Sequence, residues 1–123
     1  MIRKRILVAD DSDHVRRVLH TYFTERDFDV CGEAADGDDA IEKARALKPD
    51  LILLDFVLPR TNGIEAASAL KEMMPNVRIV LFTMYSEAVS RTFNSKRIAV
   101  DAVIDKADGV GRLQECVQSL LRS

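Results

Sequence analysis

Residues 49–63 read PDLILLDFVLPRTNG, and this stretch decides the fold that we expect for the chain. Residues 51–54 form an apolar run without polar alternation, the pattern of a strand that is covered on both faces of a parallel sheet. The run stops at Asp55, so a carboxylate lies at the carboxyl end of a buried strand, the edge where open α/β sheets bind ligands. Pro59 and Gly63 then mark a loop before the next helical pattern.

Periodicity along the rest of the chain predicts strands that alternate with helices. Apolar runs and alternating patterns predict strands at 5–9, 28–34, 51–54, 77–82 and 100–104. Apolar residues at helical spacing predict helices at 12–23, 37–47, 64–74, 86–93 and 110–121. Short connections of this kind imply right-handed crossovers, so we expect an α/β fold with one doubly wound parallel sheet between helices. The polar alternation in the second strand predicts that it lies at a sheet edge.

Length and composition restrict the class of protein. The 123 residues are enough for one domain, which we expect to span 1–123. A net charge of −2 leaves no broad basic field, which argues against direct nucleic-acid binding by this chain. No apolar run is long enough to span a membrane. Cys31 and Cys116 are interpreted as buried, reduced thiols of a cytoplasmic protein, with a disulfide as the disfavoured alternative.

Charged and hydroxyl side chains follow four of the predicted strands. Asp10 and Asp11 come after the first strand, Asp55 after the third, Thr83 after the fourth and Lys106 after the fifth. Each has an ordinary explanation on its own, since an Asp or Thr can cap a helix or start a turn and a Lys can be a solvated surface charge. Because the carboxyl ends of parallel strands share one rim, the five side chains together indicate a functional site.

The chemistry of these residue types points to phosphate. Three carboxylates at one rim repel one another unless a cation or protons intervene. Oxygen ligands with little else suit Mg²⁺, which retains several waters and typically serves phosphate chemistry. Lys106 offers a charge to a phosphoryl oxygen and Thr83 offers a hydrogen-bond donor. Since an Asp carboxylate can be a nucleophile toward phosphorus, an aspartyl-phosphate is one chemistry open to this rim.

With these features the chain resembles the receiver domains of two-component response regulators, the CheY-like superfamily. The resemblance covers essentially the whole chain and rests on Asp10-Asp11, on LLDFVLPRTNG around Asp55, on Thr83 after IVLF and on Lys106. It implies a flavodoxin-like (βα)5 fold with strand order 2-1-3-4-5, the order known for flavodoxin and for the chemotaxis member of the family. It also implies a signalling domain that is not an enzyme, catalysing at most its own phosphorylation and dephosphorylation.

The resemblance further implies roles for the acidic residues. Asp55 would be the phosphoacceptor and would take its phosphoryl group from the phosphohistidine of a sensor histidine kinase or a phosphotransfer protein. Asp11, Asp55 and the backbone carbonyl of Val57 would bind Mg²⁺ directly, with Mn²⁺ able to substitute. Asp10 would bind the ion through water.

By the same resemblance, Thr83 and Lys106 would contact the phosphoryl group. Thr83 would then move inward and shift the surface built from the last two predicted helices and the strand between them. The added charge of about −1.5 to −2 would bias this switch. The partner that reads the surface would be a downstream effector protein or an output domain missing from this chain.

Three residues depart from the common pattern of the family. Val103 stands where many members carry Tyr or Phe, Ala107 stands where Pro is frequent, and Met84 stands where a small residue is frequent. Valine has no comparable rotamer change, so the aromatic part of the usual switch is in doubt. The three features are more similar to receivers that precede helix-turn-helix output domains. Because the chain stops at Ser123, we expect no output domain in it, and it is either a stand-alone receiver or a part of a longer regulator.

Two further hypotheses concern residues outside the rim. Val57 and Tyr85 would flank the phosphorylation site, where their apolar bulk would hinder the hydrolytic water and lengthen the life of the phosphoryl group. The equal alternative is that both are ordinary loop residues. Lys96 and Arg97 could contribute to a phosphorylation-dependent homodimer or could be solvated charges.

Three other functions remain as alternatives. Asp11-Ser12-Asp13 superficially matches the D-x-D nucleophile motif of haloacid-dehalogenase-type phosphatases, but the chain has no cap domain and little room for a substrate pocket. A flavin-binding module is disfavoured because the loop after the first strand is acidic where glycines and hydroxyls are needed. A pseudo-receiver that only binds proteins would lack the acceptor or the lysine, and both are present, so it ranks below the phosphorylated switch.

Overall fold

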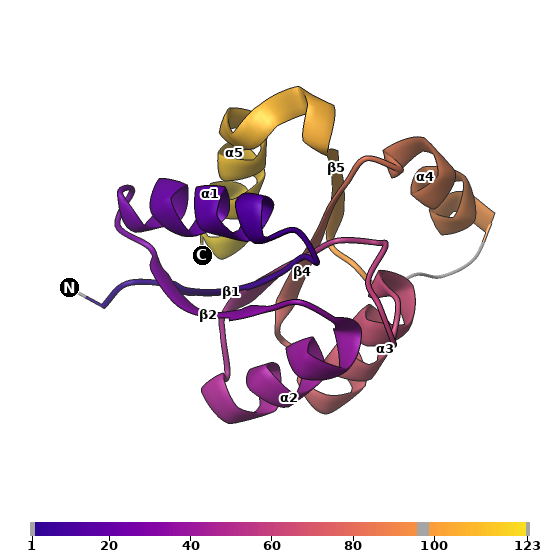
Figure 1. Ribbon diagram of the computed structural model, residues 1–123, viewed down its shortest axis with the longest axis horizontal. Helices are drawn as coiled ribbons and strands as arrows, with labels where there is room; N and C mark the ends of the chain where they lie inside the picture. The colour runs from indigo at the N-terminus through magenta and orange to yellow at the C-terminus, as the bar shows by residue number, and fades with distance from the viewer. Residues whose placement is uncertain (1, 96–98, 123) are drawn as a thin grey trace.

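The computed structural model describes residues 2–95 and 99–122, and this part of the chain forms one five-stranded parallel sheet (Figure 1). Its strand order, β2-β1-β3-β4-β5, confirms the doubly wound fold. The strands are β1 (Arg5–Ala9), β2 (Asp29–Ala34), β3 (Leu51–Leu54), β4 (Arg78–Thr83) and β5 (Ala102–Asp105). The helices are α1 (Asp13–Thr24), α2 (Gly37–Leu47), α3 (Gly63–Met73), α4 (Ser86–Ser95) and α5 (Gly109–Leu121), with a 3-10 turn η1 (Lys106–Asp108) between β5 and α5.

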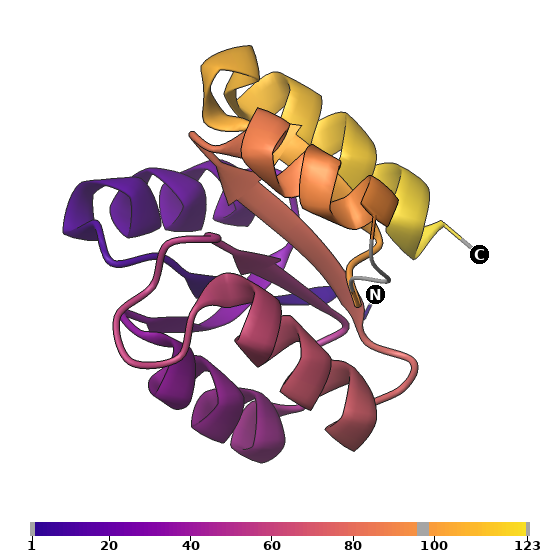
Figure 2. The same ribbon diagram turned by 90° about the vertical axis from the view of Figure 1, so that its right-hand side faces the viewer.

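Helices cover both faces of the sheet. α1 and α5 lie over one face and α2 and α3 over the other, while α4 lies beside β5 (Figures 1 and 2). In the central strand β3, Leu51 and Leu53 belong to the apolar core under α1 and α5, and Ile52 and Leu54 belong to the core under α2 and α3. All four are at most 1% exposed. The unbroken apolar run therefore does mark a strand that is buried on both faces.

The apolar pattern extends beyond the paired backbone at three strand starts. The sequence predicts Phe28, Val77 and Val100 inside strands, but each of them precedes its strand. All three side chains are nevertheless buried. The apolar pattern therefore indicates which side chains are buried and not which residues form strand hydrogen bonds. At these three positions the side chain is buried before the strand begins.

Side-chain oxygens cap three of the helices. The caps accept the N–H of the residue three positions on, and they are Ser12 for α1, Asp36 for α2 and Asn62 for α3. Ser86, where the sequence predicts that the fourth helix begins, is the first residue of α4. The Ser86 hydroxyl donates at 2.5 Å to the carboxylate of Asp105, the last residue of β5. This contact joins α4 to the end of β5.

The two cysteines are less buried than the sequence predicts. Cys31 and Cys116 are free thiols, and both are partly exposed. Cys31 lies on the edge strand β2, and Cys116 on the helix α5 packs against the core under α1 and α5. Burial raises the pKa of both thiols above the ordinary value, so both are predominantly protonated at neutral pH.

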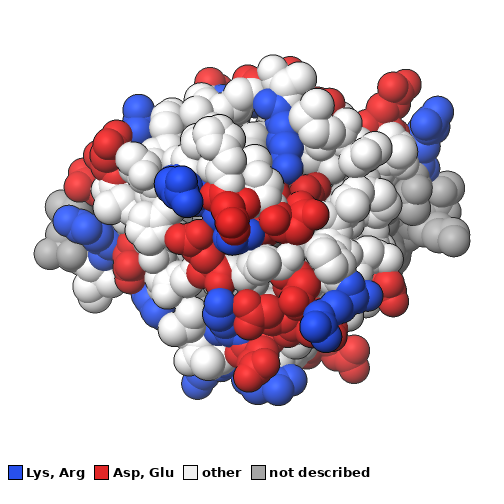
Figure 3. All heavy atoms as spheres, viewed as in Figure 1, with Lys and Arg blue, Asp and Glu red and all other residues white. Residues whose placement is uncertain are grey.

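The outer surface carries charges of both signs. On the face seen in Figure 3, Asp and Glu gather across the middle with Lys and Arg among them. No helix in the described ranges is long and apolar enough to cross a bilayer. Lys96 and Arg97, the residues of the homodimer hypothesis, lie outside the residues that the structure describes.

Two glycines lie where backbone segments approach too closely for a side chain. A Cβ added to Gly63 would lie 2.3 Å from the carbonyl oxygen of Asp55 and 2.7 Å from the Cα of Phe56. A Cβ added to Gly37 would lie 1.7 Å from the carbonyl oxygen of Thr61. The first turn of α3 therefore packs directly on the backbone that carries Asp55, and only glycine fits there.

We expect Gly63→Ala to lower the free energy of unfolding by about 1–3 kcal/mol, because the methyl group forces backbone to move. The matched control is Gly111→Ala in α5, where nothing lies within 4 Å of the added Cβ. Helix propensity should make that control more stable by about 0.5–1 kcal/mol. Urea unfolding followed by circular dichroism measures both, and equal stability of the two variants would contradict the close approach of α3 to Asp55.

Candidate functional site

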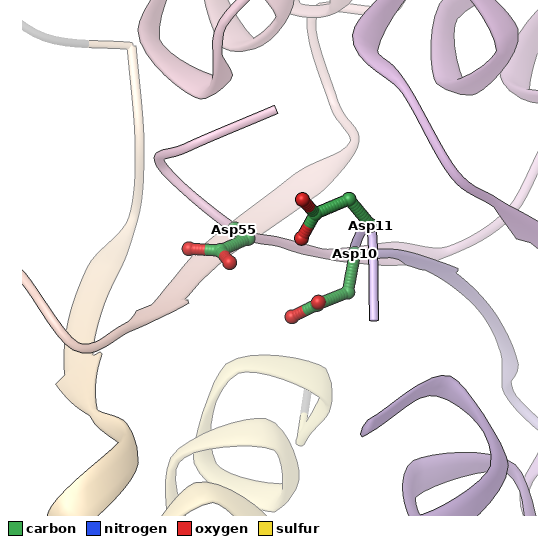
Figure 4. A group of neighbouring side chains, drawn as sticks. All are labelled: Asp10, Asp11 and Asp55. Carbon is green, nitrogen blue, oxygen red and sulfur yellow. The ribbon is translucent and has the colours of Figure 1, made fainter. Parts of the chain in front are cut away.

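All five side chains of the predicted rim lie at the carboxyl end of the sheet. Asp10 and Asp11 follow β1 and Asp55 follows β3, its neighbour in the sheet. Thr83 is the last residue of β4, and Lys106 is the first residue of η1, directly after β5. In Figure 4, Asp10, Asp11 and Asp55 leave the adjacent ends of β1 and β3 with their carboxylates facing the same side.

A largely buried lysine joins two of the carboxylates. Lys106 Nζ lies 2.7 Å from Asp10 Oδ2 and 3.0 Å from Asp55 Oδ2. Only 15% of the lysine side chain is exposed, and the two carboxylates are still more buried. One ammonium group thus connects the ends of β1, β3 and β5 in surroundings where charges interact more strongly than at an exposed surface.

Burial and pairing act in opposite directions on these groups. Burial raises the pKa of Asp10, and hydrogen bonds from Lys106 and from the Ser12 N–H offset this rise only in part. Burial alone would lower the pKa of Lys106, but its hydrogen bonds to Asp10 and Asp55 and the negative charge of both carboxylates together outweigh burial and raise it. Lys106 is therefore charged at neutral pH, whereas the surroundings of Asp10 disfavour its anion.

A third carboxylate completes a cluster suited to a divalent cation. Asp11 is exposed, and one carboxylate oxygen from each of Asp10, Asp11 and Asp55 lies within 4.8 Å of the other two. Three carboxylates face one ammonium group here, so negative charge remains in excess. The donors are hard oxygens, which match Mg²⁺ or Mn²⁺ and not the softer metals that cysteine ligands favour. The residues present fit the magnesium site that the sequence suggests.

The remaining candidate residues surround this cluster. Thr83 is fully buried, and its hydroxyl oxygen accepts the N–H of Tyr85 at 3.1 Å. Within the described residues, no hydrogen bond joins Thr83 to Asp55 or Lys106. Val57 lies in the loop after β3, and its N–H donates to Asp55 Oδ1 at 3.4 Å. Val57 and Tyr85 are 47% and 55% exposed, so both are open to solvent.

Sequence reasoning misses three side chains that contact this region. Arg16 on α1 donates to the backbone carbonyl of Asp10 at 2.6 Å, and its only signal in the sequence is its position six residues after Asp10. Ser86 donates to Asp105, which lowers the pKa of that carboxyl. Asp105 also accepts the N–H of Ala107 at 2.7 Å and so caps η1. Ser86 and Asp105 are 19 residues apart, and no local pattern marks such a pair.

Comparison with known proteins agrees with the geometry. A family model described as the response regulator receiver domain matches residues 6–118. The response regulator protein VraR of Staphylococcus saprophyticus is 36% identical over 115 residues, which cover 93% of this chain and 54% of VraR. The chemotaxis protein CheY of Thermotoga maritima is 37% identical over 78 residues, which cover 63% of this chain and 65% of CheY. The chain thus spans about half the length of VraR.

A solved structure shares the whole fold. It is the CheX-CheY-BeF3-Mg complex from Borrelia burgdorferi, with a TM-score of 0.89, 25% sequence identity and coverage of 99% of this chain and 92% of that one. The match of the family model over most of the chain, the sheet order and the acidic cluster agree with one another. This chain belongs to the family of response regulator receiver domains.

Proposed function

We propose that this receiver domain, taken as residues 1–123, is a phosphorylation switch with Asp55 as its phosphoacceptor. The observation that carries the proposal is the ammonium group of Lys106, shared by Asp10 and Asp55 beside the carboxylate of Asp11. The site thus combines a nucleophile (Asp55), a fixed positive charge (Lys106) and further oxygen ligands (Asp10 and Asp11). The phosphoryl donor is the phosphohistidine of a sensor histidine kinase or of a phosphotransfer protein.

In the proposed transfer, a carboxylate oxygen of Asp55 attacks the phosphorus atom of the phosphohistidine. The new P–O bond forms while the P–N bond breaks, and the imidazole leaves with the bonding electron pair and takes up a proton. Lys106, already 3.0 Å from Asp55, neutralises charge on the transferred group, and the Thr83 hydroxyl donates to it. These residues position and stabilise, which is most of what phosphoryl transfer requires of a protein.

The acidic cluster holds the metal ion in this proposal. Asp11, Asp55 and the backbone carbonyl of Val57 would hold the ion directly, and Asp10 would hold it through water. When bound, Mg²⁺ or Mn²⁺ neutralises charge on the phosphoryl oxygens. The excess of negative charge among the three carboxylates supports a cation site at this cluster.

The phosphoryl group on Asp55 carries about −1.5 to −2 charges in place of the −1 of the carboxylate, at the sheet edge where Thr83 is buried. We expect the Thr83 hydroxyl to leave the Tyr85 N–H for the phosphoryl group, and the surface of α4, β5 and α5 to move with it. Val103 on β5 is partly buried and carries no ring, so Thr83 is the main sensor in this chain. The reader of that surface is a downstream effector protein or an output domain outside this chain, in line with the greater length of VraR.

Phosphorylation of Asp55 is tested by intact mass after incubation with acetyl phosphate and Mg²⁺. Wild type should gain one phosphoryl group. Asp55→Asn should abolish the gain because the nucleophile is missing. Omission of Mg²⁺ should abolish it because the charge on the phosphoryl oxygens is then not neutralised. Asp27→Asn is the matched control, since Asp27 is exposed and Asn tolerates its φ of 67°. A wild type that gains nothing, even with a kinase-rich extract, would favour the pseudo-receiver, and turnover of a generic phosphomonoester would favour the phosphatase.

Replacing Lys106 should affect phosphoryl transfer without weakening metal binding. Lys106→Met takes a positive charge from beside Asp10 and Asp55, so Mn²⁺ should bind at least as tightly as to wild type. The initial rate of phosphorylation at saturating Mg²⁺ should nevertheless fall roughly tenfold to a hundredfold, because a stabilising contact to the phosphoryl oxygens is lost. A variant that is phosphorylated at the wild-type rate would rule out this role of Lys106.

The half-life of the phosphorylated protein tests whether Val57 and Tyr85 slow hydrolysis of the phosphoryl group. We expect Val57→Asn and Tyr85→Glu each to shorten the half-life of the phosphorylated protein severalfold after the donor is removed, because polar side chains admit and hold a hydrolytic water. Val57→Ile keeps the apolar bulk and is the control. Unchanged half-lives in both polar variants would mean that Val57 and Tyr85 are ordinary loop residues.

A further inference from the structure

We infer that Arg16 is a positioning residue that holds the Asp10–Asp11 peptide, and through it the metal-binding carboxylate of Asp11, in the orientation that a divalent cation requires. The inference rests on the proposed magnesium site. It adds a residue of α1 that lies outside the acidic cluster and the phosphoryl contacts.

The guanidinium of Arg16 contacts three separate parts of the structure. Nη1 donates to the backbone carbonyl of Asp10 at 2.6 Å, Nη2 pairs with Asp13, and Nε lies 3.4 Å from Glu33 Oε1. The arginine side chain is only 15% exposed. Its fork therefore links the loop after β1 to the start of α1 and to the edge strand β2, a geometry that the point charge of a lysine cannot reproduce.

With this contact, every polar group of Asp10 has a partner. Its N–H donates to the carbonyl of Ala34 at 3.0 Å, and its carboxylate accepts from the Ser12 N–H at 2.9 Å and from Lys106 at 2.7 Å. The carbonyl takes the hydrogen bond from Arg16. Because the peptide unit is planar, fixing the carbonyl and Cα of Asp10 also fixes the N–H and Cα of the next residue.

That next residue is Asp11, whose side chain is exposed. In the described ranges, no hydrogen bond or ion pair holds the Asp11 carboxylate, although it lies within the acidic cluster. The direction in which its Cα–Cβ bond leaves the chain is therefore set by the backbone alone, and the Arg16 contact orients that backbone. Outer contacts that orient metal ligands in this way typically change metal affinity by about 10–100-fold.

Charge alone makes the opposite prediction. Removing a cation near three carboxylates strengthens the binding of another cation, by Coulomb's law. The charge of Arg16 is also matched by two carboxylates, on Asp13 and Glu33. A loss of metal affinity on removal of Arg16 therefore reports lost orientation and not lost charge.

The test is a titration with Mn²⁺, followed by electron paramagnetic resonance of the free ion, without any phosphoryl donor. Arg16→Met should weaken Mn²⁺ binding by about tenfold or more relative to wild type. Arg16→Lys, which keeps the charge and loses the fork, should weaken it in the same direction, and it keeps the test decisive if the methionine variant does not fold. Arg17→Met is the matched control, because Arg17 is an exposed neighbour on α1, and its affinity should stay within about twofold of wild type.

A second readout separates positioning from a general loss of structure. At saturating Mg²⁺, the rate of phosphorylation of Arg16→Met should return to within about twofold of the wild-type rate, because the defect lies in metal binding. Unchanged or tighter Mn²⁺ binding in both Arg16 variants would overturn the inference and leave the proposed function intact. A wild type that binds no Mn²⁺ would overturn the metal site itself, and the inference with it.

Discussion

The carboxyl edge of this sheet depends on one balance of charge. Lys106 lies between Asp10 and Asp55, and these groups give up much of their hydration to be there. In the described part of the chain, the buried polar residues are Asp10, Asp55 and Thr83, and all of them lie at this edge. Removing one partner from a buried ion pair typically costs about 3–5 kcal/mol, because the other charge is left without compensation. This edge is thus held by ion pairing in addition to the apolar packing that buries the strands.

The parts of the fold that were predictable from sequence are those in which burial alone determines structure. The apolar run of β3 predicts a strand covered on both faces, and Leu51–Leu54 are indeed buried between two helical layers. Polar residues that directly follow an apolar strand pattern are easy to recognise in a sequence. Asp55 and Lys106 could therefore be assigned to one rim from the sequence. The same signal misplaces the starts of β4 and β5, since Val77 and Val100 are buried before their strands begin.

The contacts that sequence reasoning could not supply are specific side-chain pairings. The sequence does not distinguish Arg16 from a solvated charge on a helix, because nothing in the local pattern shows that its guanidinium reaches the Asp10 carbonyl. The contact of Ser86 is also unmarked in the sequence, because its acceptor Asp105 belongs to β5, 19 residues away. Such pairings depend on the relative placement of elements distant in the sequence, which periodicity does not encode. The roles proposed for Thr83 and Val57 also depend on a phosphoryl group and a metal ion, which a periodic pattern does not reveal.

The hydrogen bond from Ser86 to Asp105 links α4 to the edge of the sheet that carries the acidic cluster. Asp105 caps the turn that begins with Lys106, so the first turn of α4 and the lysine at the acidic cluster are mechanically connected. Coupling between two binding events is reciprocal: the free energy that one contributes to the other is returned in equal measure. Under the proposed function, a protein that binds α4 would therefore bias phosphorylation of Asp55, and phosphorylation would bias its binding to the same extent. Such a partner would help to determine how readily the domain accepts its signal and how firmly it retains it.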